Sequence, residues 1–176
     1  MHAPRRLKSD RLHGFRFLEL FEHELALPGG RSRRVVTFRM PDWVAVAATT
    51  SDGRFVLVRQ HRHGVDATTL EPAGGIVDPG ETPDVAAVRE LLEETGYGDG
   101  RLEPLGWVHP NPALQDNRCH LFVVRDVRSI AAPHQSEDEQ TEVHVLTADE
   151  VRSALVNGTI THALAVVTLM RAMGPR

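Results

Sequence analysis

Alternating apolar and polar residues predict a succession of β-strands along most of the chain. We expect strands near residues 15–25, 33–40, 43–50, 54–60, 102–108, 118–125 and 142–146. Between two of them, Ser51-Asp52-Gly53 indicates a tight hairpin, because Asp-Gly accepts positive φ angles. Helical segments are expected near residues 83–95, 148–156 and 162–173. This order predicts an α/β fold, with helices packed on the faces of a mixed sheet.

Length and composition fit a single globular domain. The 176 residues are 41% hydrophobic and 25% charged, which suits a chain that buries its own core. Neither a repeat nor a long linker interrupts the sequence, so we expect one domain over residues 1–176. No run approaches the roughly 18 apolar residues of a membrane span. The basic start lacks the apolar stretch of a secretory signal, and the single cysteine, Cys119, suits a reducing cytoplasm and a core position.

Charge is distributed unevenly along the chain. Residues 1–34 hold eight Lys or Arg against four acidic residues, a net charge of +4, so the other 142 residues sum to −8. An acidic body fits a metal-dependent site better than a surface that binds nucleic acid, and we expect no nucleic-acid partner. Simple decoration of the surface explains the basic segment equally well.

The helix expected at residues 83–95 has clear end signals. Thr82 can cap its first turn, Pro83 suits the first helical position, and Gly96 can end it in a left-handed conformation. A helical projection places four apolar residues within about 120° of one another. We expect this stripe to face the core: Val85, Val88, Leu91 and Leu92.

Three carboxylates share the opposite side of this helix. Glu90, Glu93 and Glu94 stand at spacings of three and four, and Arg89 can pair with Glu93 at its own i+4 position. A solvated acidic face is one interpretation. The other is a site for a hard divalent cation, which prefers oxygen ligands. Gly74-Gly75, just before the helix, would let backbone carbonyls approach such an ion.

A longer pattern contains these glutamates. Gly75 is followed after five residues by Glu81, and after seven more by Arg89-Glu90-Leu91-Leu92-Glu93-Glu94-Thr95-Gly96. This 23-residue register resembles the Nudix box, the signature of the Nudix hydrolase family, at every fixed position. Tyr97 departs from it, since the family prefers an aliphatic residue there, and the substitution affects packing alone. The strand-rich flanks and the final helix extend the resemblance over most of the chain.

The resemblance implies a fold and a reaction. Nudix proteins form an α/β/α sandwich with a mixed sheet, in which the box is a loop–helix–loop. They hydrolyse a pyrophosphate that joins a nucleoside diphosphate to a second group, usually with Mg²⁺, for which Mn²⁺ can substitute. A metal suits this chemistry, because it neutralises the anionic pyrophosphate and lowers the pKa of the attacking water.

The resemblance also assigns metal ligands. Glu90 and Glu94 are the principal expected ligands, Glu93 assists, and the carbonyl of Gly74 completes the set. Glu94 is accordingly expected among the catalytic residues. We expect Glu94→Gln to abolish turnover while the fold stays intact.

Four further box residues are expected to support the site. Arg89 orients a carboxylate by a bidentate contact, and Glu81 locks the loop to the helix. Gly75 lies in the loop before the helix and allows a close approach of the backbone, and Gly96 ends the helix.

Segments outside the box resemble one subgroup, the ADP-ribose pyrophosphatases and related nucleoside diphosphate sugar hydrolases. The approach Leu70-Glu71-Pro72-Ala73-Gly74-Gly75, the basic strand end 59–63 and Asn111-Pro112 all carry this resemblance. They imply a nucleotide-sugar substrate. The acidic segment 134–143 resembles the loop that supplies the base, with Glu137 as base and Glu139 as a further catalytic or metal-binding group. A mobile acidic surface loop is the alternative.

Five residues are candidates for substrate binding. Guanidinium groups match phosphate oxygens, which favours Arg59, Arg62 and Arg118, although each arginine suits an exposed surface equally well. Glu71, in the segment 70–75, is also a candidate. Trp43 could stack on a nucleobase, but a tryptophan at the start of a strand also suits the core.

In this subgroup the N-terminal strands are exchanged between two subunits and complete each other's base pocket. Residues 1–40 are partly basic and include alternating segments, so we expect them to form N-terminal strands of a homodimer. Three alternatives stay open: a Nudix enzyme for dinucleoside polyphosphates, one for GDP-sugars, and a non-catalytic Nudix binding module. The last is disfavoured because Glu81, Glu90, Glu93 and Glu94 are all present.

Overall fold

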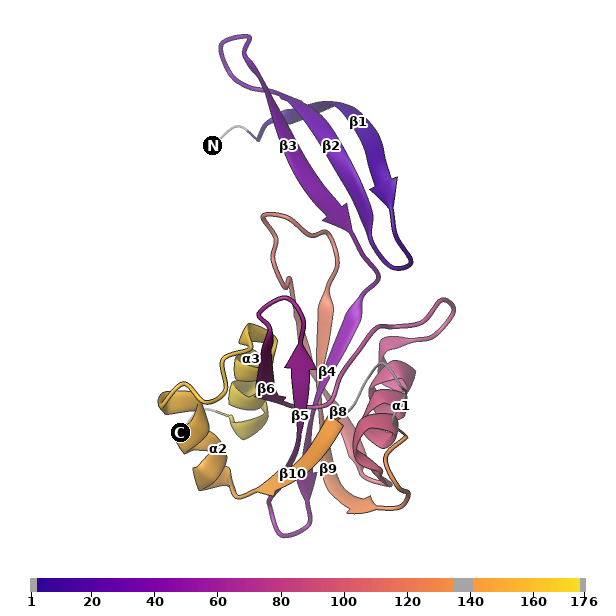
Figure 1. Cartoon of the computed structure of the whole chain (residues 1–176), viewed down its shortest axis with the longest axis vertical. Helices are drawn as coiled ribbons and strands as arrows, with labels where there is room; N and C mark the ends of the chain where they lie inside the picture. Colours follow the sequence, from indigo (N-terminus) through magenta and orange to yellow (C-terminus); the bar gives the residue numbers. More distant parts are fainter. Residues whose placement is uncertain (1–2, 135–140, 175–176) are drawn as a thin grey trace. The chain divides into compact units, whose positions relative to one another are not determined.

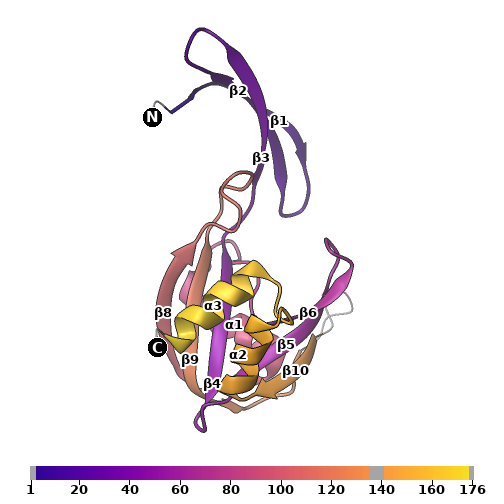
Figure 2. The ribbon, with the colours of Figure 1, turned by 90° about the vertical axis from the view of Figure 1, so that its left-hand side faces the viewer.

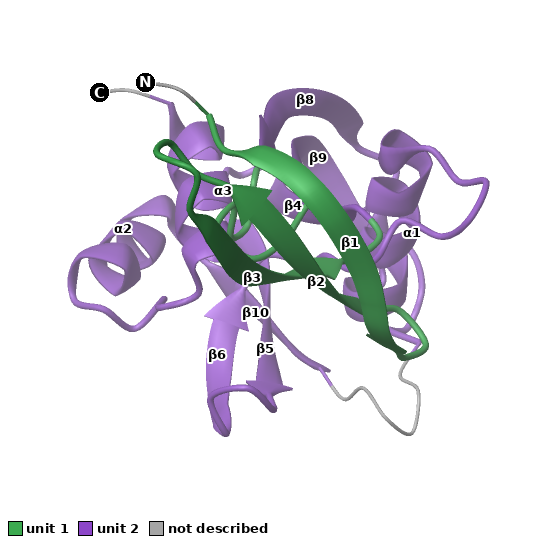
Figure 3. Ribbon diagram, turned by 90° about the horizontal axis from the view of Figure 1, so that it is seen from above, with its two compact units in different colours: residues 1–41, 109–118 green, residues 42–108, 119–176 purple. Residues whose placement is uncertain are grey.

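The computed structural model describes residues 3–134 and 141–174, and the chain forms two compact units (Figure 3). Unit 1 comprises residues 1–41 and 109–118, and unit 2 comprises residues 42–108 and 119–176. The expectation of a single domain over residues 1–176 stays a prediction. Within the described part of the chain, no helix is long and apolar enough to cross a membrane.

Unit 1 is built on a three-stranded antiparallel sheet in the order β1-β2-β3. Its strands are β1 (Arg5–Gly14), β2 (Glu19–Ala26) and β3 (Ser32–Arg39). The sequence did not predict β1, because its residues are mostly polar and nearly all are exposed. The expected strand 15–25 begins later than predicted, since residues 15–18 form a turn closed by a bond from Phe15 N to Leu18 O.

Unit 2 contains a seven-stranded mixed sheet. Its strands are β4 (Trp43–Thr50), β5 (Phe55–Arg62), β6 (Ala67–Glu71), β7 (Tyr97–Gly98), β8 (Arg101–Val108), β9 (Cys119–Ser129) and β10 (Thr141–Leu146). The order is β10-β5-β4-β9-β7, with β6 paired to β5 and β8 paired to β9. Only β4 and β9 are parallel among these described pairs, and the others are antiparallel. This confirms the predicted mixed sheet.

Three helices cover the two faces of that sheet. α1 (Pro83–Thr95) lies on one face, and α2 (Ala148–Val156) and α3 (Ala163–Met173) lie on the other (Figures 1 and 2). One buried cluster joins α1 to the sheet through Ala87 and Leu91, and a second joins α2 and α3 to it through Val151 and Leu169. The predicted α/β/α sandwich is therefore confirmed.

The buried side of α1 differs from the predicted stripe. Ala86, Ala87 and Leu91 are buried, whereas Val85 and Val88 are 53% and 49% exposed. Alanine side chains let the helix lie close against the sheet, and this rotation turns the valines outward. The same rotation turns Glu90 and Glu94 inward, so these two do not lie opposite the core as the projection suggested.

The ends of α1 match the sequence in two respects and differ in one. Pro83 opens the helix, and Gly96 ends it at φ 72° with its N–H donating to Leu92 O at 2.8 Å. Thr82 stands at the N-cap, but its hydroxyl makes no capping bond. It hydrogen-bonds Asp84 instead and helps hold the pKa of that carboxyl below its usual range.

Candidate active site

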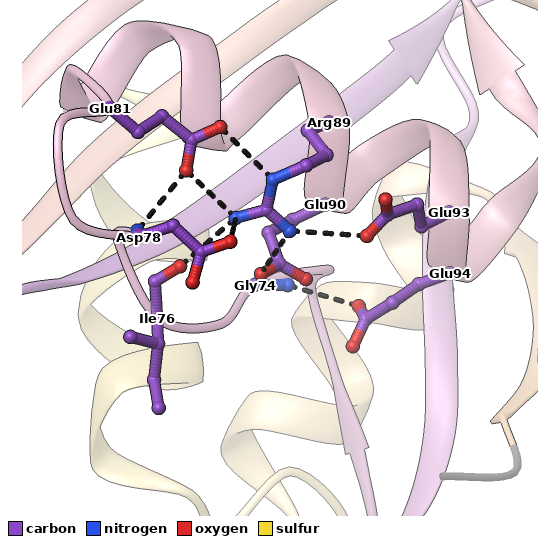
Figure 4. A network of polar contacts seen from close by, with 8 residues as sticks. All are labelled: Gly74, Ile76, Asp78, Glu81, Arg89, Glu90, Glu93 and Glu94. Atoms are coloured by element: carbon purple, nitrogen blue, oxygen red, sulfur yellow. Dashed lines mark hydrogen bonds and ion pairs between the residues drawn. The ribbon is translucent and has the colours of Figure 1, made fainter. Parts of the chain in front are cut away.

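A two-glycine loop between β6 and α1 forms the centre of the site. The carbonyls of Ala73 and Gly75 accept bonds from Val46 N and Val44 N on β4. Along such an extended segment, successive N–H and C=O groups alternate in direction, so those of Gly74 point away from β4. Gly74 N accordingly donates to Glu94 Oε2 at 3.0 Å (Figure 4).

Both glycines lie where an added side chain would meet a neighbour at close range. A Cβ on Gly75 would lie 2.3 Å from Oε1 of Glu90, and a Cβ on Gly74 would lie 2.3 Å from the carbonyl oxygen of Val44. Because these two residues have no side chains, the carboxylate of Glu90 can lie against Gly75 and that of Glu94 against Gly74. Successive turns of α1 supply these carboxylates, because the i, i+4 spacing puts them on one side of the helix.

Arg89 holds the acidic cluster together. Its guanidinium binds Glu81 through Nε at 3.0 Å and Nη2 at 2.9 Å, and its Nη1 binds Glu90 at 2.9 Å and Glu93 at 3.1 Å (Figure 4). Nη2 also donates to the carbonyl of Ile76 at 3.0 Å. The expected pair with Glu93 forms, but Arg89 also binds Glu90, the residue that follows it, so Glu93 is not its sole partner among the three helix glutamates.

These contacts change the acid–base properties of the pair Arg89–Glu81. Hydrogen bonding to Glu81 is the main reason that the pKa of Arg89 lies above its ordinary value. The same bonds from Arg89 lower the pKa of Glu81. Since Asp78 N also donates to Glu81 at 3.2 Å, Glu81 contacts both the loop before the helix and Arg89 on the helix.

The exposed fraction separates the three helix glutamates. Glu94 is 8% exposed, and the side chains of Glu90 and Glu93 are 13% and 45% exposed. Glu90 and Glu94 thus lie at the loop, and Glu93 lies nearer to the solvent. A fully solvated acidic face, the alternative interpretation, does not fit this burial.

This donor set fits a hard divalent cation. Within residues 3–134 and 141–174, no three His, Cys, Asp or Glu side chains gather into a complete cation cage. Mg²⁺ needs no such cage, since one or two carboxylates, waters and substrate phosphates usually bind it. Glu90, Glu94 and the outward carbonyl of Gly74 offer that partial set.

A second polar cluster lies on the same face of the sheet. Arg62 at the end of β5 donates to Glu71 at the end of β6 from Nε and from Nη2, both at 2.9 Å. Glu71 is 2% exposed and also accepts bonds from Thr69 Oγ1 and His162 Nδ1. Burial alone would raise the pKa of Glu71, but the bonds from His162, Arg62 and Thr69 outweigh it and lower that pKa to about 2.

The sheet register connects the two clusters. Gln60 pairs with Thr141 on one side and with Thr69 on the other, and paired residues share a face. Thr141 Oγ1 donates to Glu94 O at 3.0 Å. Arg62 is on the same face of β5 as Gln60. The C-terminal end of α1 contacts this face at Thr141, which is paired with Gln60.

The other candidates are placed differently. Arg59 lies three positions from Arg62 on one strand, so the two arginines point to opposite faces. Trp43 packs against the buried residues Cys119 and Leu121, which favours the core interpretation over base stacking. Arg118 is exposed and belongs to unit 1. Glu137 and Glu139 lie outside the described residues.

Sequence reasoning missed His162 and Thr141. Each joins the site through a contact that spans many residues, 91 from His162 to Glu71 and 47 from Thr141 to Glu94. No local spacing signals such contacts. The sequence placed His162 at the start of the expected helix 162–173, and a histidine at that position does not by itself indicate function.

Unit 1 contains a cavity of about 240 Å³ with aromatic and basic walls. Arg39 lies over the ring of Phe21 at 4.5 Å, the rings of Phe21 and His23 are stacked at 6.0 Å, and Pro112 contributes from the 109–118 segment. Burial is the main reason that the pKa of His23 is lowered, and the charges of Arg6 and Arg39 add to it.

A buried acidic loop–helix–loop on an α/β/α sandwich defines a class of metal-dependent hydrolases. The NUDIX domain model matches residues 39–165 of the chain. The chain therefore belongs to the Nudix family, as the box predicted. Nudix hydrolases generally use divalent metal ions.

Relatives place the chain near one part of the family. It is 28% identical over 145 residues to an ADP-ribose pyrophosphatase of Bacillus subtilis, covering 82% of this chain and 78% of the relative. It is 26% identical over 175 residues to an ADP-ribose pyrophosphatase of Mycobacterium tuberculosis, covering 96% and 83%. A methanol dehydrogenase activator of Bacillus methanolicus is 32% identical over 145 residues, covering 82% and 78%. The predicted subgroup resemblance is confirmed.

A solved structure gives the same architecture. The crystal structure of an ADP compounds hydrolase superposes with a TM-score of 0.83 at 22% identity, covering 98% of this chain and 94% of that one. At this identity the match supports the fold alone.

Proposed function

We propose that this protein hydrolyses the pyrophosphate bond of ADP-ribose or a related nucleoside diphosphate sugar, giving a nucleoside monophosphate and a sugar phosphate. The observation that carries the proposal is the convergence of Glu90 and Glu94 on the Gly74-Gly75 loop. The names of the relatives, ADP-ribose pyrophosphatase and ADP-sugar pyrophosphatase, support the substrate class.

Glu90, Glu94 and the Gly74 carbonyl are proposed to hold Mg²⁺, with Glu93 assisting from its more exposed position. The bound ion supplies charge neutralisation at the pyrophosphate and a water of lowered pKa. Arg89 keeps Glu90 in place, and Glu81 keeps Arg89 in place. Glu137 as the base and Glu139 as a further ligand stay proposals from the sequence.

Substrate recognition is proposed to involve Arg62 of unit 2. Arg62 supplies a guanidinium on the face that also meets α1, and it suits a phosphate oxygen. Arg118 and Arg59 are weaker candidates, because the first is simply exposed and the second lies on the opposite face from Arg62.

Two further properties belong to this proposal. A homodimer is supported by the large apolar side chains that unit 1 exposes, Leu12, Phe15 and Phe17 among them. A cytoplasmic location is supported by the free, buried Cys119, which suits a reducing compartment.

Phosphatase-coupled phosphate release with Mg²⁺ tests the activity. The panel is ADP-ribose, ADP-glucose, GDP-mannose, NADH and diadenosine polyphosphates. Preference for ADP-ribose, with AMP and ribose 5-phosphate as products, is the expected result and would direct specificity mutagenesis to residues 110–118. A folded protein that is silent on the whole panel would contradict the proposal.

Glu94→Gln tests the site itself. The change keeps the size and removes the charge, so turnover should fall by about 1,000-fold or more while the melting temperature changes little. Glu103→Gln on β8 is the matched control, since Glu103 pairs with Arg101 and Arg125 away from the box. Near-wild-type turnover of Glu94→Gln in excess Mg²⁺ would exclude the proposed ligand role.

Glu137→Gln and Glu139→Gln separate the two roles proposed for the acidic segment. The first should lower turnover at every Mg²⁺ concentration. The second should also raise the Mg²⁺ concentration that gives half-maximal rate. Wild-type rates for both variants would remove the segment from the mechanism.

A further inference from the structure

The carboxylate of Glu71 is saturated by the protein itself. Its Oε1 accepts bonds from Arg62 Nε and Thr69 Oγ1, and its Oε2 accepts bonds from Arg62 Nη2 and His162 Nδ1. An ionised carboxylate offers about four acceptor positions. All four are occupied, so the direct substrate contact expected for Glu71 does not fit the structure.

Glu71 and Arg62 form a two-point pair that fixes the plane of the guanidinium. The pair uses the edge formed by Nε and Nη2, so the Nη1 group is turned away from Glu71. The Arg62 side chain is 38% exposed, whereas Glu71 is 2% exposed. The arginine thus presents one edge of its guanidinium to a buried anchor, while its side chain as a whole stays partly exposed.

His162 fixes the anchor from the opposite layer of the sandwich. It is the N-cap residue of α3, which covers the face of the sheet opposite α1. Because ionised Glu71 can only accept, the Nδ1 atom of His162 carries the proton in this contact. The N–H at that position holds Oε2 and so restricts rotation of the Glu71 carboxylate about its terminal C–C bond.

We propose that His162 is a positioning residue for substrate binding, which together with Thr69 orients Glu71 and thereby holds the Arg62 guanidinium to receive a phosphate oxygen of the nucleotide sugar. This inference rests on the proposed function for its substrate. It adds a residue from the C-terminal helix, outside the box, to the binding of the diphosphate group.

The chain offers a graded set of variants. In His162→Asn the amide Nδ2 occupies the place of the ring Nδ1 and can still donate to Glu71. In His162→Gln the side chain keeps its polarity, but the amide nitrogen lies one bond farther out. His162→Ala removes the donor altogether. His144→Ala is the matched control, because His144 also lies beside a glutamate, Glu142 at 3.2 Å, but on β10.

Steady-state kinetics with ADP-ribose give the first readout. His162→Ala and His162→Gln should raise KM about ten-fold with kcat within about two-fold, because a binding contact that does not change in the transition state affects KM. His162→Asn should restore KM to within about two-fold. In an Arg62→Gln background the effect of His162→Ala on KM should disappear, since the two residues act in one chain of contacts.

A merely structural role predicts the reverse pattern. His162→Ala would then lower kcat and the melting temperature together at unchanged KM, or its effect on KM would multiply with that of Arg62→Gln. Either result would overturn the proposal. If His162→Ala does not fold, the comparison of His162→Asn with His162→Gln decides, and equal KM values for these two would overturn it as well.

Nitrogen NMR of the arginine side chains tests the proposal without any substrate. The Nε–H of Arg62 should exchange with water about ten-fold faster in His162→Ala than in the wild type or His144→Ala. If the wild type does not hydrolyse ADP-ribose, the proposed function fails, and this measurement still judges the orientation of Arg62. An Arg62 exchange rate that His162→Ala leaves unchanged would overturn the positioning role.

Discussion

Glu71 shows how a single buried charge makes stability depend on pH. Its pKa is lowered to about 2, from 4.5, so it favours folding most strongly above pH 4.5, and this contribution is lost as the pH falls toward 2. We predict that Glu71→Gln lowers the free energy of unfolding by on the order of 3 kcal/mol at pH 7 and by about 1 kcal/mol at pH 3. Urea denaturation at the two pH values measures the difference.

Glu103→Gln, which alters a carboxylate that is about one-third exposed, provides the comparison for this prediction. Its effect should be within about 0.5 kcal/mol at both pH values. If the deficit of Glu71→Gln is the same at pH 7 and pH 3, the folded-state ionisation of Glu71 does not control stability in this range.

Cys119 is a second residue whose properties follow from its surroundings. It is fully buried in the cluster with Ala45 and Leu121, and burial, assisted by the charge of Asp42, raises its pKa to about 12. The thiolate is the reactive form, so we predict no reaction of the native protein with an aromatic disulfide reagent at pH 8. Absorbance should rise by one thiol equivalent after unfolding, and fast labelling before unfolding would contradict the buried position.

The sequence predicts contacts that depend on local spacing and misses those that depend on tertiary folding. Glu81, Arg89 and Glu94 lie within 14 positions, and a loop–helix–loop brings them together wherever it occurs. His162 reaches Glu71 only because α3 packs on the far face of the sheet. Arg59 and Arg62 appeared equivalent from residue type, and the strand register alone separates them.

At the level of elements, the helix boundaries could be predicted but the helix orientation could not. Pro83 and Gly96 mark the ends of α1 through backbone conformation, which is local. The predicted apolar stripe placed Val85 and Val88 toward the core because valine is more hydrophobic than alanine. The sheet instead selects Ala86 and Ala87, since close packing of a helix on strands needs small side chains.

The two loop glycines before α1 should respond differently to substitution. The added methyl group of Gly74→Ala meets the backbone of β4 at Val44 O, which cannot move without distorting the sheet. The methyl group of Gly75→Ala meets the flexible end of Glu90. We therefore predict that Gly74→Ala destabilises by about 2–3 kcal/mol, and that Gly75→Ala costs less than about 1 kcal/mol but lowers kcat by roughly 100-fold.

Denaturation curves and rates measured on both variants check this contrast. Gly53→Ala gives a reference for alanine in a turn without crowding, because no atom lies within 4 Å of its added methyl group, although its φ of 80° adds strain. Should Gly75→Ala keep full activity, the displacement of Glu90 would not matter for the reaction, and its proposed ligand role would be excluded.

At the scale of the whole molecule, unit 1 exposes several large apolar side chains. Three strands with one covering segment form a marginal structure on their own, and Leu12 and Val36 are 52% and 42% exposed. A second copy of the chain would cover such surfaces. This agrees with the homodimer that we expect from the sequence of residues 1–40. We expect the protein to have twice the mass of one chain at micromolar concentration, measured by light scattering after gel filtration.

Substitutions in unit 1 test whether it is the surface that joins the copies. Leu12→Lys combined with Val36→Lys should give monomers, because two charges at each copy of an apolar interface cost several kcal/mol to bury. Val156→Lys in α2 is the matched control, since Val156 is 89% exposed and belongs to unit 2. A wild-type monomer would exclude the dimer, and a double variant that stays dimeric would exclude Leu12 and Val36 from the interface.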